Sequence, residues 1–163
     1  MKSLPTPSGS DRELVISRVI AATPERLFRA WTTQLSEWWG PHGMTTPVVE
    51  MDLRPGGIFR TVMRAPDGTD YPTKGVFLEV VKDERIVFTD AFDAGWEPDP
   101  DLFFTAITTF TALPGGRTEY KARALHWTVA SRNKHEKMGF HQGWGESLDR
   151  LAALVTRLNK NEA

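Results

Sequence analysis

The chain has 163 residues, 40% of them apolar, and its 20 lysines and arginines against 21 aspartates and glutamates give a formal net charge of −1. This length supports one sizeable core rather than two large domains, and the balanced charge offers no positive field for nucleic acid or an anionic membrane, so we expect neither partner. The absence of cysteine excludes disulfides, thiol nucleophiles and thiolate metal sites.

Residues 1–10 are rich in proline, serine and glycine and contain little to bury. This composition predicts a flexible leader before a single folded domain over residues 11–160. The leader lacks the apolar stretch of a secretion signal, and no run elsewhere approaches the ~20 apolar residues of a membrane helix. We therefore expect a cytoplasmic protein.

The first folded elements are predicted to be a strand and two short helices. Residues 13–20 mix β-branched and apolar side chains with polar ones, which is typical of a strand. The Thr-Pro-Glu sequence at 23–25 supplies a capping hydroxyl, a proline at the first helical position and an acid in the first turn, so a helix begins here and ends near residue 32. A second short helix is predicted over 35–39, where Gly40 and Pro41 end it.

The middle of the chain predicts an antiparallel meander. Short apolar runs are separated by turn-forming proline, aspartate and glycine, as at 65–70 and 113–117. The segment 94–101, with its prolines and acids, is expected to be a longer exposed loop. The predicted strands are 48–53, 57–64, 72–82, 85–91, 102–112 and 117–127.

A long amphipathic helix follows the meander. Trp144, Leu148, Leu151 and Val155 recur at helical spacing, which predicts a helix that runs to about residue 158. If its start lies as far back as residue 131, the glycines at 139, 143 and 145 make that stretch bent or mobile. Because this helix is the only element long enough to cover the apolar face of the sheet, the sequence predicts an α+β fold whose curved antiparallel sheet wraps around it.

Strand alternation predicts which side chains face this helix. Arg60 and Arg64 prefer water, which turns Phe59, Thr61 and Met63 inward. In the strand at 117–127 the charges share the outer face, and the inward side chains are Thr118, Tyr120, Ala122, Ala124 and His126. Two small alanines in this wall indicate either a void or room for large neighbours, and the sequence leaves both open.

His126 is the titratable candidate on that inward face. Its unperturbed pKa of ~6.5 would let it anchor or protonate a ligand, although a histidine satisfied within the core is the more ordinary interpretation. His135 and His141 do not share one helical face, and the zinc-protease pattern is missing from the sequence. We therefore expect no metal site and no cofactor.

Two tryptophans and several strand acids complete the candidates. Trp38 and Trp39 occupy adjacent positions of a predicted helix, so we expect one ring in the core and the other at a cavity rim or a partner contact. The strand acids have no spacing that pairs them as a catalytic dyad and are expected to face water; they are Glu50, Asp52, Glu79 and Asp90.

Several short segments resemble a known protein family. They are FRAWT at 28–32, EWWGPHG at 37–43, RPGG at 54–57, KGVFLEV at 74–80, RIVFTD at 85–90, and the segment 138–151 with MGF, GW and SLDRL. The pattern resembles the bacterial branch of the activator of heat-shock-protein-90 ATPase homologue family. That family belongs to the wider SRPBCC group, which is related to START lipid-transfer domains, the major birch-pollen allergen and polyketide cyclases.

The resemblance implies a helix-grip fold. In this fold a seven-stranded antiparallel sheet wraps around the C-terminal helix, two small helices close one end, and an apolar cavity lies between sheet and helix. Because the fold hosts carriers, cyclases and co-chaperones, function has to be argued from the site. The first hypothesis is a binding protein for a small apolar or aromatic molecule, held among Trp39, Phe59, Met63, Phe77, Phe88, Tyr120, His126, Phe140 and Trp144.

Two other functions stay open as alternatives. An enzyme of the polyketide cyclase or hydrolase type would use His126 or an inward acid as general acid or base, and replacing His126 by phenylalanine would then abolish turnover. A chaperone co-factor is the third hypothesis. Eukaryotic activators join this domain to an N-terminal chaperone-binding domain, whereas about ten residues precede the first predicted strand, so we do not expect a chaperone partner. A homodimer through an open sheet edge or near Trp38 is a further alternative.

Overall fold

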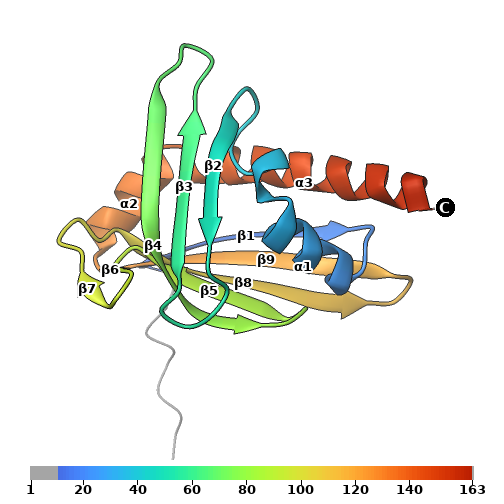
Figure 1. Cartoon of the computed structure of the whole chain (residues 1–163), viewed down its shortest axis with the longest axis horizontal. Helices are drawn as coiled ribbons and strands as arrows, with labels where there is room; N and C mark the ends of the chain where they lie inside the picture. Colours follow the sequence, from blue (N-terminus) through green and yellow to red (C-terminus); the bar gives the residue numbers. More distant parts are fainter. Residues whose placement is uncertain (1–10, 163) are drawn as a thin grey trace, which may run out of the picture.

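The computed structural model describes residues 11–162, which form a curved sheet with helices on its concave side (Figure 1). The leader predicted for residues 1–10 lies outside the described residues. The elements are β1 (Glu13–Ile20), α1 (Pro24–Thr33), the 3-10 helix η1 (Leu35–Glu37), β2 (Thr45–Met51), β3 (Ile58–Arg64), β4 (Asp70–Val81), β5 (Arg85–Thr89), β6 (Phe92–Asp93), β7 (Glu97–Pro98), β8 (Phe104–Leu113), β9 (Arg117–His126), α2 (Val129–Lys137) and α3 (Phe140–Glu162).

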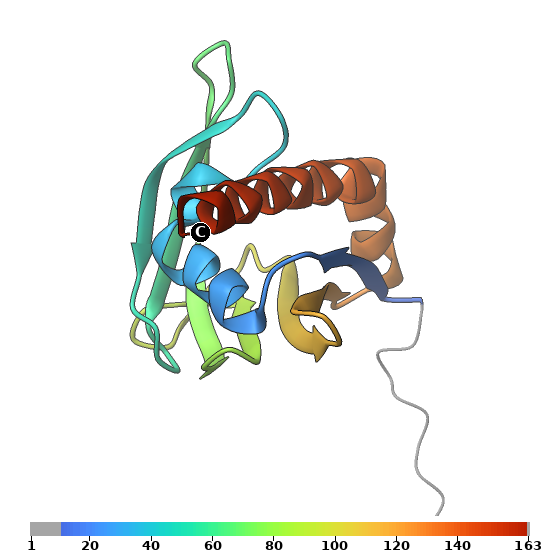
Figure 2. The ribbon, with the colours of Figure 1, turned by 90° about the vertical axis from the view of Figure 1, so that its right-hand side faces the viewer.

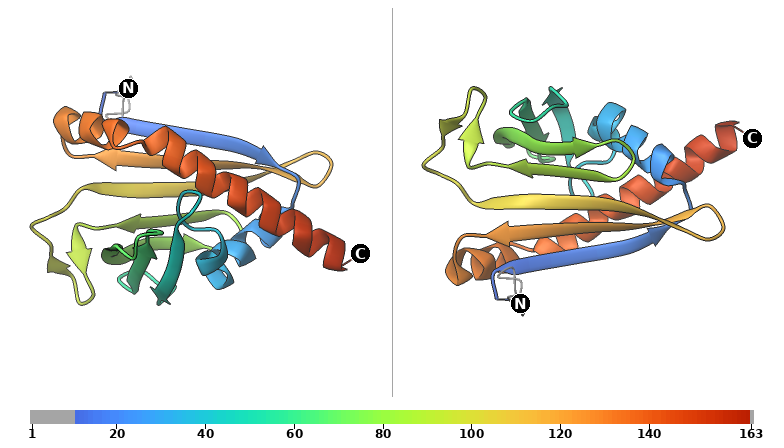
Figure 3. Two further views of the ribbon diagram at one scale, coloured as in Figure 1. Left: turned by 90° about the horizontal axis from the view of Figure 1, so that it is seen from above. Right: turned by 90° about the horizontal axis from the view of Figure 1, so that it is seen from below.

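Seven strands form the main sheet in the order β1-β9-β8-β5-β4-β3-β2, and each neighbouring pair is antiparallel. The predicted curved antiparallel sheet around the C-terminal helix is therefore confirmed. β2, β3 and β4 rise along one flank of α3, while β1 and β9 pass beneath it (Figures 1 and 2). Seen from above, α3 crosses the sheet obliquely (Figure 3).

The predicted faces of the strands are confirmed. All five inward side chains of β9 are buried, and its alternate residues are more exposed. On β3, Thr61 is 1% exposed and Phe59 is 6% exposed. Arg60 and Arg64 lie on the outer face in ion pairs, with Glu50 and Asp70 respectively. One concave face of the sheet is thus available to α3.

The C-terminal helical segment is divided rather than continuous. α2 ends at Lys137 and α3 begins at Phe140. Gly139 between them has a φ of +97°, a conformation that L side chains rarely adopt, and the chain turns sharply here (Figure 2). The glycine-weakened stretch is therefore a sharp turn between two helices. The predicted loop over 94–101 also contains structure, since β6 and β7 pair as a small hairpin.

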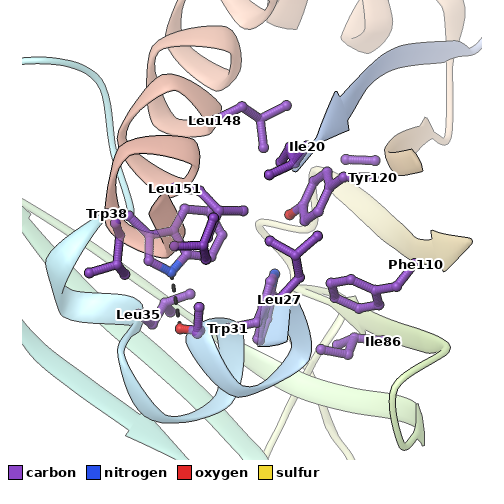
Figure 4. Close-up of a cluster of buried hydrophobic side chains, with 14 of the residues drawn as sticks. Ile20, Leu27, Trp31, Leu35, Trp38, Ile86, Phe110, Tyr120, Leu148 and Leu151 are labelled. Carbon is purple, nitrogen blue, oxygen red and sulfur yellow. Dashed lines mark hydrogen bonds between the residues drawn. The ribbon is translucent and has the colours of Figure 1, made fainter. Parts of the chain in front are cut away.

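A solid core fills the space between α1 and the central part of α3 (Figure 4). Trp31, Leu27 and Leu35 from the first helices pack against Leu148 and Leu151 of α3. Thr23 begins α1 as predicted, because its hydroxyl accepts a hydrogen bond from the Arg26 amide at 3.3 Å. The core therefore occupies one end of the concave face, close to α1.

The two adjacent tryptophans take the two positions expected of them. Trp38 is 1% exposed, and its Nε1 donates to the Ala30 carbonyl at 3.1 Å. Trp39 is partly buried and also packs against the core, with its ring 5.4 Å from that of Trp38. Trp38 therefore supplies the core ring, and Trp39 packs against the core and lines the adjoining cavity, as expected.

None of the helices in the described part of the chain is long and apolar enough to cross a membrane.

Candidate functional site

A cavity of about 430 Å³ lies beside the core, between the concave face of the sheet, α3 and the turn that joins α2 to α3. Its floor comes from β3, β5, β8 and β9, and α3 forms its roof. Leu148, Tyr120 and Phe59 belong to both the core and the cavity wall, so they mark the boundary between the filled and the hollow end of the concave face.

The wall of the cavity is predominantly aromatic. The ring centroids of Phe59 and Phe88 are 4.9 Å apart, and those of Trp39 and Phe59 are 6.0 Å apart. On the opposite side, Phe140 and Trp144 pack with their centroids 4.4 Å apart. Aromatic pairs at these separations hold each other in fixed orientations. The apolar wall is thus built by rings that support one another.

The two alanines of β9 have different surroundings. Ala124 is fully buried against Leu14 and Phe140, which fill the space in front of it. Ala122 lines the cavity. Both alternatives left open by the sequence therefore occur, since one alanine admits large neighbours and the other leaves vacant space.

Most hydroxyls of the cavity are already paired within the protein. Thr73 pairs with Thr61 at 2.6 Å, and Thr89 pairs with Thr105 at 2.9 Å. Ser147 Oγ donates to the Trp38 carbonyl at 3.0 Å and accepts from the Gly40 amide at 3.2 Å. These side chains contribute little free hydrogen-bonding capacity to the hollow.

Asp90 departs from the expectation that the strand acids face water. Glu50, Asp52 and Glu79 do form exposed ion pairs. Asp90 instead lines the cavity, and its Oδ1 accepts from the amides of Phe103 at 2.8 Å and Phe104 at 3.2 Å. Burial raises the pKa of this carboxyl above its usual value.

α3 holds the loop that carries Trp39 in place. Besides the two bonds of Ser147, Arg150 Nη1 donates to the Gly40 carbonyl at 2.9 Å and the Pro41 carbonyl at 3.2 Å. The positive φ of Gly40 brings these backbone groups toward the helix. One wall of the cavity is therefore fixed to its roof by direct hydrogen bonds.

Two histidines form a pair at the end of the cavity near α2. His126 Nε2 and His135 Nδ1 are 2.9 Å apart, and His126 Nδ1 lies 2.9 Å from the Arg12 carbonyl oxygen. His126 is 5% exposed and His135 is 7% exposed. Burial, together with the neighbouring His126, lowers the pKa of His135 to about 4, so this histidine is neutral at pH 7.

The structure places most of the predicted site residues around one hollow. Seven of the nine residues line the cavity: Trp39, Phe59, Met63, Phe88, Tyr120, Phe140 and Trp144. Phe77 is fully buried in the core behind Phe59, with the two rings stacked at 4.9 Å. His126 contacts the cavity-lining His135 but is not itself a lining residue. Ligand binding by these residues stays a prediction.

His135 and Asp90 are lining residues that the sequence interpretation did not select. A continuous helix leading back from Trp144 and Phe140 places Glu136, not His135, at the next inward position. The turn at Gly139 changes this register and brings His135 inward. The sequence signal that could have identified His135 is its place as the single histidine of a polar helical segment that ends at Met138 and Gly139.

Comparison with known proteins agrees with this architecture. The family model described as "Activator of Hsp90 ATPase homolog 1-like protein" matches residues 21–156. The chain belongs to this family. The resemblance inferred from the short segments is thereby confirmed. The search of curated protein sequences found no match.

Solved structures of bacterial proteins share the fold. A protein from Nitrosomonas europaea is 33% identical, with 93% of this chain and 98% of that chain aligned at a TM-score of 0.88. One from Mycobacterium smegmatis is 28% identical over 88% of this chain and 90% of that chain, at a TM-score of 0.74. A family protein from Silicibacter pomeroyi is 28% identical over 88% of this chain and 97% of that chain, at a TM-score of 0.60. The helix-grip arrangement is therefore a property of this Hsp90-activator-like family.

Proposed function

We propose that this member of the family binds a small apolar or aromatic molecule in the cavity under α3. The observation that carries the proposal is a hollow of about 430 Å³ with aromatic walls beside an otherwise well-filled core. Binding sites for small molecules typically enclose roughly 300–1,000 Å³ and combine apolar walls with a few polar groups.

The composition of the wall supports a largely apolar occupant. The rings of Phe59, Phe88 and Trp144 present apolar surface, and most hydroxyls are paired with other protein groups. Moving an apolar ligand from water onto such a surface is favourable by roughly 25 cal/mol per Å² buried. A strongly anionic ligand would lose its hydration without gaining a free counter-ion, because the lining Lys74 already pairs with Asp93 at 3.2 Å.

The test is a titration with N-phenyl-1-naphthylamine, a neutral probe whose fluorescence rises in apolar surroundings. We expect saturable binding at one site per chain. Ala122→Leu places an isobutyl group in the cavity, and we expect the affinity for the probe to fall by about tenfold or more as the space is filled.

Ala153→Leu provides the matched control, because Ala153 is exposed on the outer side of α3. It makes the same chemical change outside the cavity and should leave the affinity unchanged. Absence of saturable binding, or equal effects of the two substitutions, would contradict the proposed function. Urea unfolding of both variants checks that each remains folded.

A further inference from the structure

The pair formed by His126 and His135 has a defined hydrogen-bonding direction. The Arg12 carbonyl oxygen can only accept, so the His126 Nδ1 beside it carries the proton. In the neutral ring His126 Nε2 is then an acceptor, and the His135 Nδ1 at 2.9 Å donates to it. The same reasoning leaves Nε2 of His135 without a proton and with a free lone pair.

His135 lines the cavity, and its Nε2 lies on the side of the ring away from His126. The two nitrogens of an imidazole point in nearly opposite directions, and Nδ1 points toward His126, which is not a lining residue. Among the described residues, none forms a hydrogen bond with His135 Nε2. The ring is therefore a hydrogen-bond acceptor that the protein itself leaves unused.

Aromatic rings isolate this acceptor from competing groups. Phe103, Phe104 and Phe140 have their centroids 4.8, 5.0 and 5.2 Å from that of His135. Trp144 lies 5.9 Å away. In such an apolar setting a hydrogen bond to a ligand is stronger than in water, and an unpartnered polar group is costly.

We infer that His135 Nε2 binds a phenol-type hydroxyl carried by an otherwise apolar, aromatic ligand. This inference rests on the proposed function, since it names the chemical class of the molecule held in the cavity. The ligand must donate, because both histidines are oriented so that Nε2 of His135 accepts. An anionic ligand is disfavoured, because Asp90 lines the same cavity and the lining Lys74 already pairs with Asp93 at 3.2 Å.

Burial keeps the Nε2 atom of His135 unprotonated, as the hydrogen bond to the ligand requires. The low pKa of His135 means that Nε2 stays unprotonated at pH 7. A phenol-type hydroxyl is a good donor that is itself uncharged at that pH. His126 acts as a positioning residue, because its bond to Nδ1 of His135 fixes the tautomer.

The experiment compares three compounds of nearly equal size as competitors of N-phenyl-1-naphthylamine. 2-Naphthol can donate a hydrogen bond, 2-methoxynaphthalene can only accept one, and 2-methylnaphthalene can do neither. The measured quantity is the affinity for 2-naphthol relative to 2-methylnaphthalene, which cancels the general contribution of apolar contact.

We expect His135→Phe to reduce this ratio about tenfold, because the variant keeps the aromatic packing but leaves the naphthol hydroxyl without an acceptor. The relative affinity of 2-methoxynaphthalene should not change. His141→Phe is the matched control, since His141 is exposed at the start of α3 and does not line the cavity. It should preserve the ratio of the unmodified protein.

A double variant protects the test against misfolding. His135→Phe leaves His126 Nε2 unpaired, whereas His126→Phe combined with His135→Phe replaces both partners by apolar rings of similar shape. The double variant should show the same reduced ratio. Binding of all three compounds with a ratio unchanged by either variant would overturn the inference while leaving the proposed function intact.

The tautomer can be measured without a ligand. Two-bond proton–nitrogen correlation spectra at pH 7 should show the proton on Nδ1 of both His126 and His135. A proton on Nε2 of His135 would overturn the inference, whatever the cavity binds. If the probe binds but none of the three naphthalenes displaces it, the inference fails, whereas the proposed function fails only if the probe itself shows no saturable binding in the cavity.

Discussion

At the scale of single residues, His135 is a neutral histidine enclosed by aromatic rings. Its pKa of about 4 in the folded chain is below the value of 6.5 for a free side chain. As the pH falls below 6.5, the unfolded chain takes up the proton first, so stability decreases until the pH reaches about 4. The raised pKa of Asp90 acts in the opposite direction, since its folded form binds protons more readily.

We therefore predict a loss of stability on mild acidification that depends on His135. Between pH 7 and pH 4 the free energy of unfolding should fall by up to about 3 kcal/mol on account of this residue. Urea unfolding at several pH values measures it. His135→Phe should show a shallower decrease in stability over that range, because the variant lacks the destabilising contribution of His135. The opposite contribution of Asp90 is retained in it. An identical pH dependence in both proteins would show that His135 is not the cause.

Single residues also show the limits of sequence interpretation. Strand alternation correctly turned Phe59, Tyr120 and His126 inward, because period-two burial depends only on local geometry. Asp90 did not follow the rule for exposed strand acids. It comes directly after β5, and its carboxylate accepts hydrogen bonds from the backbone amides of Phe103 and Phe104 at the start of β8. Partners from a distant part of the chain are not visible in local pattern.

At the scale of elements, the turn between α2 and α3 decides which residues reach the cavity. The sequence correctly indicated a weakened stretch around Gly139, and the apolar spacing from Trp144 onward predicted α3. It did not predict the sharp break or the inward position of His135, since both depend on the sign of one φ angle. Glycine permits either sign, so its presence does not fix the turn.

The turn gives a prediction that compares two glycines. Gly139→Ala meets no steric obstacle, because nothing lies within 4 Å of the added Cβ, but its φ of +97° is unfavourable for alanine. We expect a loss of about 1–2 kcal/mol in the free energy of unfolding, measured in urea.

Gly145→Ala is the corresponding control within α3. Its added Cβ would make an ordinary contact with Ile16 at 3.6 Å, and alanine favours the helix, so stability should stay the same or rise by up to about 1 kcal/mol. Equal losses in the two variants would show that the positive φ of Gly139 is not the determining feature.

At the scale of the whole molecule, the space beneath α3 is divided into a filled end and a hollow end. The core around Trp31 and Leu151 occupies the end near α1, and the cavity occupies the end near α2. The order of elements was predictable because each strand and helix carries its own periodicity. The division was not, because a vacant volume is the difference between the space that a curved sheet encloses and the side chains that fill it.

The hollow end is the central claim, and intermolecular nuclear Overhauser effects between 2-methylnaphthalene and the methyl groups of the protein test it most directly. The account predicts contacts with Met63, Ala122 and Leu148, which line the cavity from three different elements. The exposed Val15 and Val19 on β1 should show none. Contacts confined to such surface methyls, with none to the three cavity methyls at saturating ligand, would contradict it.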